Sequence, residues 1–177
     1  MSDVKKSLDP QAVRDELTRL AEIAAGMLDG EQVKAVITGK AMNYIANPNP
    51  KHRYLSGDYY DVDHDAFLRT KKFLTRLERL GSVRLNGSVW VPVPGREEVT
   101  VAVQNGAHHR YYQFGQERLA TPPEMKEVFQ TGKVTPAPVG PDDKLVAVLA
   151  PVRDSLGDVV GVVELTAPLD VEGPAWS

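Results

Sequence analysis

The segment with the most varied side-chain chemistry is 110–114, which reads Arg-Tyr-Tyr-Gln-Phe. Alternate side chains of an extended strand point to opposite faces, so Arg110, Tyr112 and Phe114 are expected to share one face. A guanidinium group binds a carboxylate through two hydrogen bonds, and aromatic rings supply apolar walls around it. This pattern is typical of a site for a small anionic organic ligand. The alternative is a structural role, in which the rings fill the core and Arg110 lies at its solvent edge.

Alternating carboxylates at Asp61, Asp63 and Asp65 resemble the first half of an EF-hand calcium loop. The sixth position of such a loop requires glycine and the twelfth a bidentate glutamate, whereas this chain has Ala66 and Lys72 there. Acidic residues at a helix N-terminus also cap the helix and favour its dipole. Capping is therefore the preferred interpretation, and we expect no metal site.

Other motifs for metal binding and catalysis are missing from the sequence. The chain has no cysteine and four histidines, no two of which are spaced four residues apart. No serine lies in a Gly-x-Ser-x-Gly motif, and no glycine-rich phosphate loop is present. We expect no catalytic residue and no cofactor. A small enzyme whose catalytic residues are scattered along the chain is the remaining alternative.

The composition is that of one ordinary globular domain, with 177 residues, 42% hydrophobic and 25% charged. A net charge of −3 provides no basic field to attract phosphate backbones, so nucleic acid is not an expected partner. No segment approaches the roughly 18 consecutive apolar residues that span a bilayer, so we expect no direct membrane insertion.

Helical patterns occupy the first half of the chain. Asp9 followed by Pro10 predicts a helix start, and apolar residues then recur at steps of three and four up to Met27. Gly30 is expected in a left-handed position after this helix, with a second short helix over 31–41.

A loop is predicted over 43–60, where proline, glycine and asparagine are frequent. A third helix follows from Asp61 to about Leu80, and a short helix over 124–130 ends before Gly132.

Strand-like patterns dominate the second half. Asn86-Gly87 is compatible with a tight hairpin turn that would divide the first strand. The predicted strands are Ser82–Val93, Val99–Val103, Arg110–Phe114, Lys144–Pro151 and Val159–Ala167. This order predicts an α+β fold with an antiparallel sheet of about five strands and helices packed on one side.

Glu164 interrupts the apolar run of the last predicted strand. An unpaired buried carboxylate is costly, so the side chain is expected to face outward. Pairing with Arg110 or Lys144 is the alternative.

In the final hairpin, Leu145–Leu165, an apolar strand ending in Ala-Pro-Val is followed by a short turn with Asp154 and Gly157, and then by Val-Val-Gly-Val. This pattern resembles the closing strands of bacterial PAS/Cache-like sensor domains, specifically the single Cache type. The alanine-rich stretch 20–30 is also similar to the entry helix of some bacterial sensor regions.

The resemblance implies a ligand pocket built from the central sheet and the loop that follows the first helices. Its candidate ligand-binding residues are Trp90, Arg110, Tyr112, Tyr59 and Tyr60. The implied function is non-catalytic sensing of a small organic ligand, transmitted through the N-terminal helices or a signalling partner protein. A ligand-free protein-interaction or scaffold domain on the same fold is the alternative.

The expected organisation has four parts. These are a flexible N-terminus over 1–8, a helical arm over 9–42, the PAS/Cache-like sensor domain over 43–169 and a disordered tail over 170–177. The apolar stripe of the arm packs either on the domain's own core or on a second copy, so a homodimer is expected. The chain is expected to be cytoplasmic if it is complete and periplasmic if it is a fragment of a membrane receptor.

Overall fold

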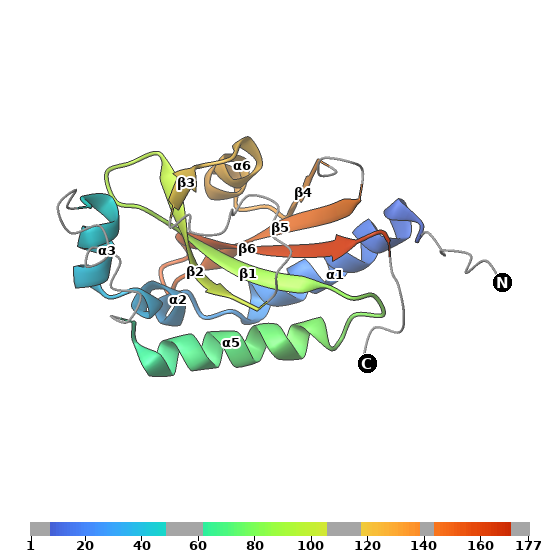
Figure 1. Cartoon of the computed structure of the whole chain (residues 1–177), viewed down its shortest axis with the longest axis horizontal. Coiled ribbons are helices and arrows are strands. Elements are labelled where there is room, and N and C mark those ends of the chain that lie inside the picture. Colours follow the sequence, from blue (N-terminus) through green and yellow to red (C-terminus); the bar gives the residue numbers. More distant parts are fainter. Residues whose placement is uncertain (1–7, 49–61, 106–117, 139–143, 171–177) are drawn as a thin grey trace.

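The protein folds as an antiparallel sheet covered by helices, which confirms the predicted α+β class (Figure 1). The computed structural model describes residues 8–48, 62–105, 118–138 and 144–170. The helices are α1 (Pro10–Met27), α2 (Gly30–Val36), α3 (Gly39–Ala46), α5 (His64–Glu78) and α6 (Pro123–Thr131). The strands are β1 (Asn86–Pro92), β2 (Glu98–Gln104), β3 (Arg118–Ala120), β4 (Thr135–Ala137), β5 (Leu145–Arg153) and β6 (Val159–Pro168).

The six strands lie in the order β3-β2-β1-β6-β5-β4, and every neighbouring pair is antiparallel. This is one strand more than the number predicted. The edge strands β3 and β4 have three residues each, and β4 contains Pro136, so neither shows the length or alternation that reveals a strand in sequence. The strand predicted over 110–114 lies outside the described residues.

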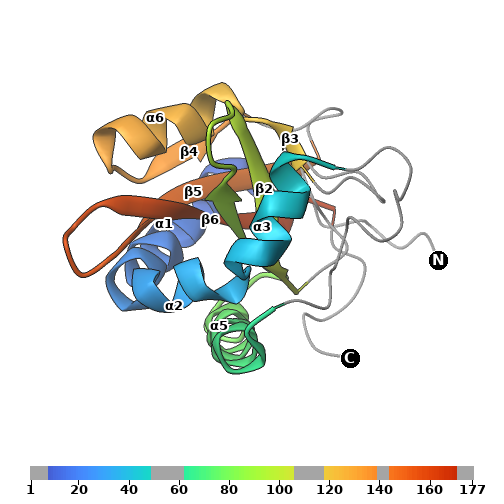
Figure 2. The same cartoon turned by 90° about the vertical axis from the view of Figure 1, so that its left-hand side faces the viewer.

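Helices cover both faces of the sheet, rather than one face as predicted (Figure 2). Buried residues of α1, α2 and α5 form one core with Val89, Val163 and Leu165 of the central strands. On the opposite face, α6 buries Met125 and Val128 against Trp90 and its neighbours. The sequence did not reveal this because strands with apolar residues on both faces do not show which helix covers which face.

Two short helices occur where the sequence predicted one helix over 31–41 followed by a loop. α2 ends at Val36, and Ile37 adopts extended backbone and forms an isolated antiparallel bridge with Val62. Thr38 then caps α3, because its hydroxyl accepts a hydrogen bond from the backbone N–H of Ala41 at 3.2 Å. The break places α3 beyond the ends of the central strands (Figure 1).

Capping explains the acidic residues at the start of α5. The carboxylate of Asp63 accepts a hydrogen bond from the backbone N–H of Ala66 at 2.9 Å. Within the described residues, no group of three histidine, cysteine or acidic side chains is placed to hold a metal ion. The capping interpretation of this motif is therefore confirmed for Asp63.

Asn86 and Gly87 do not form the hairpin turn that their types allow. Both belong to β1, where Asn86 pairs with Thr166 and Gly87 with Leu165 of β6. A Cβ atom on Gly87 would lie 3.1 Å from a methyl group of Leu74 in α5. Glycine therefore permits the close approach of α5 to the sheet.

Gly30 is the first residue of α2, not the left-handed residue predicted after α1. A Cβ atom at this position would collide with the backbone carbonyl of Arg153 at the end of β5. The small residue thus lets the α1–α2 junction touch the turn between β5 and β6.

Two polar contacts hold this junction on the turn. Lys34 contacts Asp154 at 3.0 Å, and the carboxylate of Glu31 accepts a hydrogen bond from the hydroxyl of Ser155 at 2.8 Å. The pKa of Asp154 is lowered chiefly by its hydrogen bond from Lys34, and hydrogen bonds from Lys34 and Ser155 lower the pKa of Glu31.

Replacing Gly30 with alanine tests this close contact. We expect Gly30→Ala to destabilise the protein by about 1–3 kcal/mol, since the added methyl group must displace the backbone of the turn. Gly26→Ala is the matched control, because a Cβ there meets nothing within 4 Å and alanine favours a helix. Urea unfolding of both variants measures the difference. Equal stability of the two would contradict the proposed contact.

Candidate functional site

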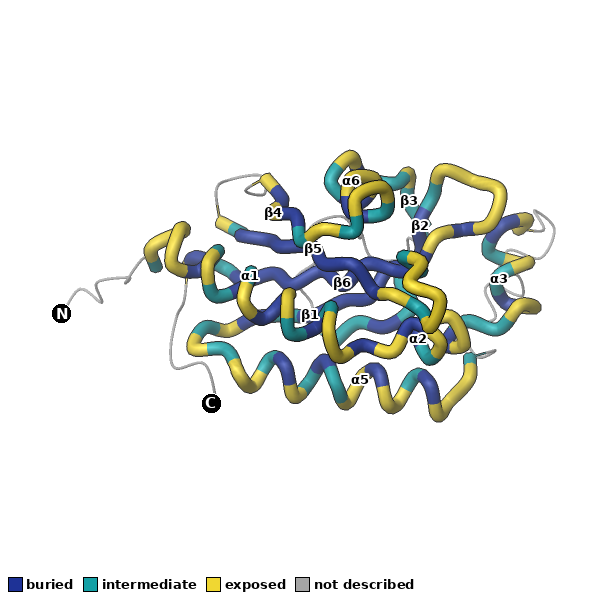
Figure 3. Tube along the Cα trace, turned by 180° about the vertical axis from the view of Figure 1, so that it is seen from behind, coloured by how far each residue is buried: buried dark blue, intermediate teal, exposed yellow. Residues whose placement is uncertain are grey.

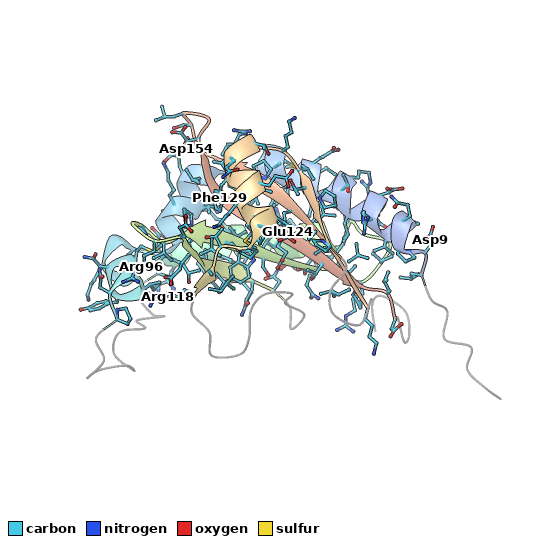
Figure 4. All side chains as sticks on the ribbon, turned by 90° about the horizontal axis from the view of Figure 1, so that it is seen from above. Asp9, Arg96, Arg118, Glu124, Phe129 and Asp154 are labelled. Atoms are coloured by element: carbon cyan, nitrogen blue, oxygen red, sulfur yellow. The ribbon has the colours of Figure 1, made fainter. Side chains whose placement is uncertain are left out.

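An apolar cluster lies on the sheet face opposite α1. It is centred on Trp90, which is completely buried between neighbouring strands and α6. In register, Trp90 stands opposite Val162 of β6 and Val101 of β2. Figure 4 shows α6, with Glu124 and Phe129, lying across this face of the sheet. The other buried members of the cluster are Val99, Met125, Val128, Leu149 and Val162.

Local signals in the sequence set where α6 begins and ends and which of its sides is buried. Pro122 and Pro123 begin the helix, and Gly132 ends it with a positive φ of 62°. Met125 and Val128, three residues apart, both face the sheet and are fully buried. The helix is thereby held at both ends and along one side.

A row of buried polar side chains continues from the apolar cluster along β1 and β6. Ser88 stands directly opposite Glu164, so their side chains share a face with Trp90 and Val162. Thr166 follows Glu164 by two residues and therefore lies on the same face. The exposed fractions of Ser88, Glu164 and Thr166 are 3%, 1% and 2%. This polar row and the adjoining apolar cluster form the candidate site.

The prediction that Glu164 faces outward is wrong. Both carboxylate oxygens are inaccessible to solvent, because β6 lies between β1 and β5 and is covered on both faces. Lys144 is not its partner. Leu149 is the residue opposite Glu164, and Lys144 lies five residues from Leu149, about 17 Å along the strand. The other predicted partner, Arg110, lies outside the described residues.

Of the predicted ligand-binding residues, the structure places Trp90 on the candidate face. Arg110, Tyr112, Tyr59 and Tyr60 lie outside the described residues. The sequence signalled Glu164 as an anomaly within an apolar strand but did not connect it with a site. Ser88 and Thr166 gave no signal, because serine and threonine are common on either face of a strand.

Arg118 on the edge strand β3 joins α3 to the sheet (Figure 4). Its guanidinium group donates hydrogen bonds to the carbonyls of Ile45 at 2.6 Å and Ala46 at 3.3 Å. It also forms an ion pair with Glu98 at 3.3 Å. A short edge strand is thus held by side-chain contacts as well as by pairing with β2.

A half-buried carboxylate links α5 to the strand that carries Ser88. Glu78 accepts a hydrogen bond from the backbone N–H of Gly87 at 2.8 Å. Burial raises the pKa of Glu78, and the hydrogen bond from Gly87 opposes that rise. The position of Ser88 is therefore tied to the end of α5 through the neighbouring residue.

Comparison with known proteins gives structural neighbours of low sequence identity. One is a GAF domain of A. aeolicus nlh2, with 14% identity, a TM-score of 0.40, and coverage of 88% of this chain and 83% of that one. Another is the inducer-binding domain of the PobR transcription factor from Acinetobacter, solved with 3-hydroxybenzoic acid, with 13% identity, a TM-score of 0.42, and coverage of 62% and 87%.

A third neighbour is the sensory domain of the Campylobacter jejuni chemoreceptor Tlp3, with 11% identity and a TM-score of 0.35. The match covers 89% of this chain, which spans 61% of that domain. No protein-family model and no curated protein matches the sequence.

No helix among the described residues is both long and apolar enough to cross a bilayer.

Shortening Met125 tests whether α6 seals the candidate site. We expect Met125→Ala to destabilise the protein by about 2–5 kcal/mol, because it removes fully buried apolar volume. Trp90 fluorescence should shift to longer wavelength as water reaches the ring, measured with Trp176 replaced by phenylalanine. Gln130→Ala is the control on the exposed side of α6 and should change stability by less than about 0.5 kcal/mol. An unchanged emission spectrum in Met125→Ala would contradict the sealing role.

Proposed function

We propose that this protein is a non-catalytic sensory domain that binds a small organic ligand on the sheet face containing Trp90 and Glu164. The observation that carries the proposal is the burial of Glu164 at the boundary between an apolar cluster and a polar row. Burying a carboxylate costs free energy that an apolar residue at the same position would not. Charged groups kept in such surroundings are frequently functional.

The proposed pocket extends from this face to the residues that the sequence resemblance implies. Arg110 would bind an anionic group of the ligand, and Tyr112, Tyr59 and Tyr60 would supply walls. Glu164 would require a hydrogen-bond donor or a cationic group on the ligand as well, because a carboxylate accepts hydrogen bonds and attracts cations. The favoured ligand is therefore a carboxylic acid that also carries an amino or hydroxyl group.

Transmission is proposed to run through the N-terminal helices. Residues 30–34 contact the turn of the β5–β6 hairpin, and Glu164 lies on β6 of that hairpin. A ligand that shifts β6 would therefore move the strand that begins at this turn. Lys34 and Glu31 are the side chains expected to report the shift.

A thermal-shift screen with matched pairs of compounds tests the proposed ligand class. α-Amino and α-hydroxy acids are compared with carboxylic acids of the same carbon skeleton that lack the amino or hydroxyl group. At a concentration of about one hundred times Kd, a ligand should raise Tm by about 5–10 °C. We expect stabilisation by the substituted acid and little by its unsubstituted partner.

Three variants separate the site from general effects. Arg110→Ala and Glu164→Gln should each weaken binding at least tenfold, since each removes a charge from the proposed pocket. Glu127→Gln removes an exposed carboxylate on α6 and should leave binding unchanged. Stabilisation that persists in Glu164→Gln would place the ligand elsewhere.

A ligand-free scaffold domain is the second candidate function. It predicts that no amino acid, carboxylate or purine raises Tm. Turnover of any compound in the panel would instead indicate an enzyme. The thermal-shift screen therefore separates a sensor from a scaffold, and a product assay on the same compounds tests for an enzyme.

Homodimer formation is a further part of the proposal, and α1 limits how it occurs. Val13, Leu17, Leu20, Ala21 and Ala24 of α1 are buried in the domain's own core. The apolar stripe of α1 is thus buried within the domain, so a dimer must form through other surfaces. We expect sedimentation velocity of the intact chain to show a concentration-dependent dimer. A single monomeric species at all concentrations would exclude it.

A further inference from the structure

One face of α5 is densely basic and exposed to solvent. Figure 3 shows exposed positions along the outer side of this helix, whose inner side packs on the sheet. Its cations are Arg69, Lys71, Lys72 and Arg76 of α5 and Arg79 at its C-cap, and all five are exposed. This set is called the basic face below.

Four of the five cations of the basic face form one continuous stripe. Positions 69, 72, 76 and 79 are separated by three or four residues, so their side chains follow one side of the helix for about 15 Å. Of the acidic residues of α5, Asp65 lies before this stretch and Glu78 lies within it, between Arg76 and Arg79. Asp65 is in the first turn, and Glu78 is directed to the backbone of Gly87.

The cations of the basic face have few partners within the described part of the chain, although the positive charge of Lys71 opposes the rise in the pKa of Glu78. None of them forms an ion pair with a described residue, and Lys71 alone makes a ring contact, 5.6 Å from the centre of Phe67. A single-sign cluster of this kind repels itself, which costs stability. It is also opposite in sign to the net charge of the chain, −3.

A shallow groove runs along this face. It has a volume of about 260 Å³ and is lined by Leu68, Lys71, Lys72, Thr75, Arg76 and Arg79. Leu68 at one end is 48% exposed, and Leu80 just beyond the other end is 60% exposed. The groove therefore combines cationic side chains with the exposed apolar side chain of Leu68, and the exposed Leu80 follows Arg79 in the sequence.

We propose that the basic face docks an acidic helix of a partner protein. A helix with glutamate or aspartate at steps of three and four presents a stripe of the same spacing and opposite sign. Its ridge of side chains fits a groove between ridges of α5, while Leu68 and Leu80 contact apolar residues at its ends. Such pairing steers association and sets the partner's orientation.

Two other classes of polyanion fit the surface less well. An anionic membrane favours an amphipathic helix whose apolar face can enter the bilayer, whereas Ala66, Thr70, Leu74 and Leu77 of α5 are buried in the protein. A nucleic acid is repelled by the net negative charge outside this one stripe.

Fluorescence anisotropy with a labelled peptide tests the proposal on the intact chain. The probe is a helical peptide of about 18 residues with glutamates at steps of three and four and a leucine near each end. Lys72→Glu/Arg76→Glu should raise Kd at least tenfold. Arg19→Glu/Lys133→Glu makes the same change in net charge at exposed residues elsewhere and should change Kd less than twofold. Raising the salt from about 50 mM to about 300 mM should weaken wild-type binding.

The neutral pair Lys72→Gln/Arg76→Gln repeats the test if charge reversal disturbs folding, which far-UV circular dichroism checks. Two competing probes are a duplex DNA and vesicles of phosphatidylcholine with phosphatidylglycerol. Tighter binding of either than of the peptide would overturn the proposal. So would an absence of peptide binding, or equal peptide binding by the two charge-reversal variants.

Discussion

Burial of the β5–β6 hairpin on both faces is the constraint on which the rest of this structure depends. The two strands pair from Leu145 to Arg153, and β6 is buried continuously from Gly161 to Ala167 (Figure 3). A strand buried in this way needs cover on each face, so helices must pack on both sides of the sheet. Its second edge is filled by β1, which leaves no backbone edge open along the centre of the sheet.

The burial of Glu164 follows from this constraint. At an edge or on an open face, its carboxylate would be hydrated and unremarkable. In the middle of β6, the same group is removed from water and faces the cluster around Trp90. Desolvation strengthens its interaction with any cation or hydrogen-bond donor that reaches it, because the local dielectric constant is low. This is the physical basis for proposing a ligand that carries such a donor.

The basic face of α5 and the candidate ligand site lie on opposite sides of the sheet and are connected by a few contacts. α5 packs Leu74 near Gly87, and Glu78 accepts the backbone hydrogen bond of the same glycine. The next residue, Ser88, stands opposite Glu164. The basic face of α5 and the candidate ligand site are therefore separated by the thickness of one sheet. A ligand that moves β1 would act on the helix proposed to dock a partner.

The sequence by itself determined the elements that have strong local signals. Capping at Asp9 and Asp63, apolar spacing in α1 and α5, and the glycine after α6 depend on neighbours in the chain, so the helices could be predicted. The final hairpin was predictable for the same reason. The tertiary structure alone decided the role of Gly30, the short edge strands, the position of α6 and the burial of Glu164. Each of these depends on contacts between residues far apart in the chain, which alternation and spacing do not encode.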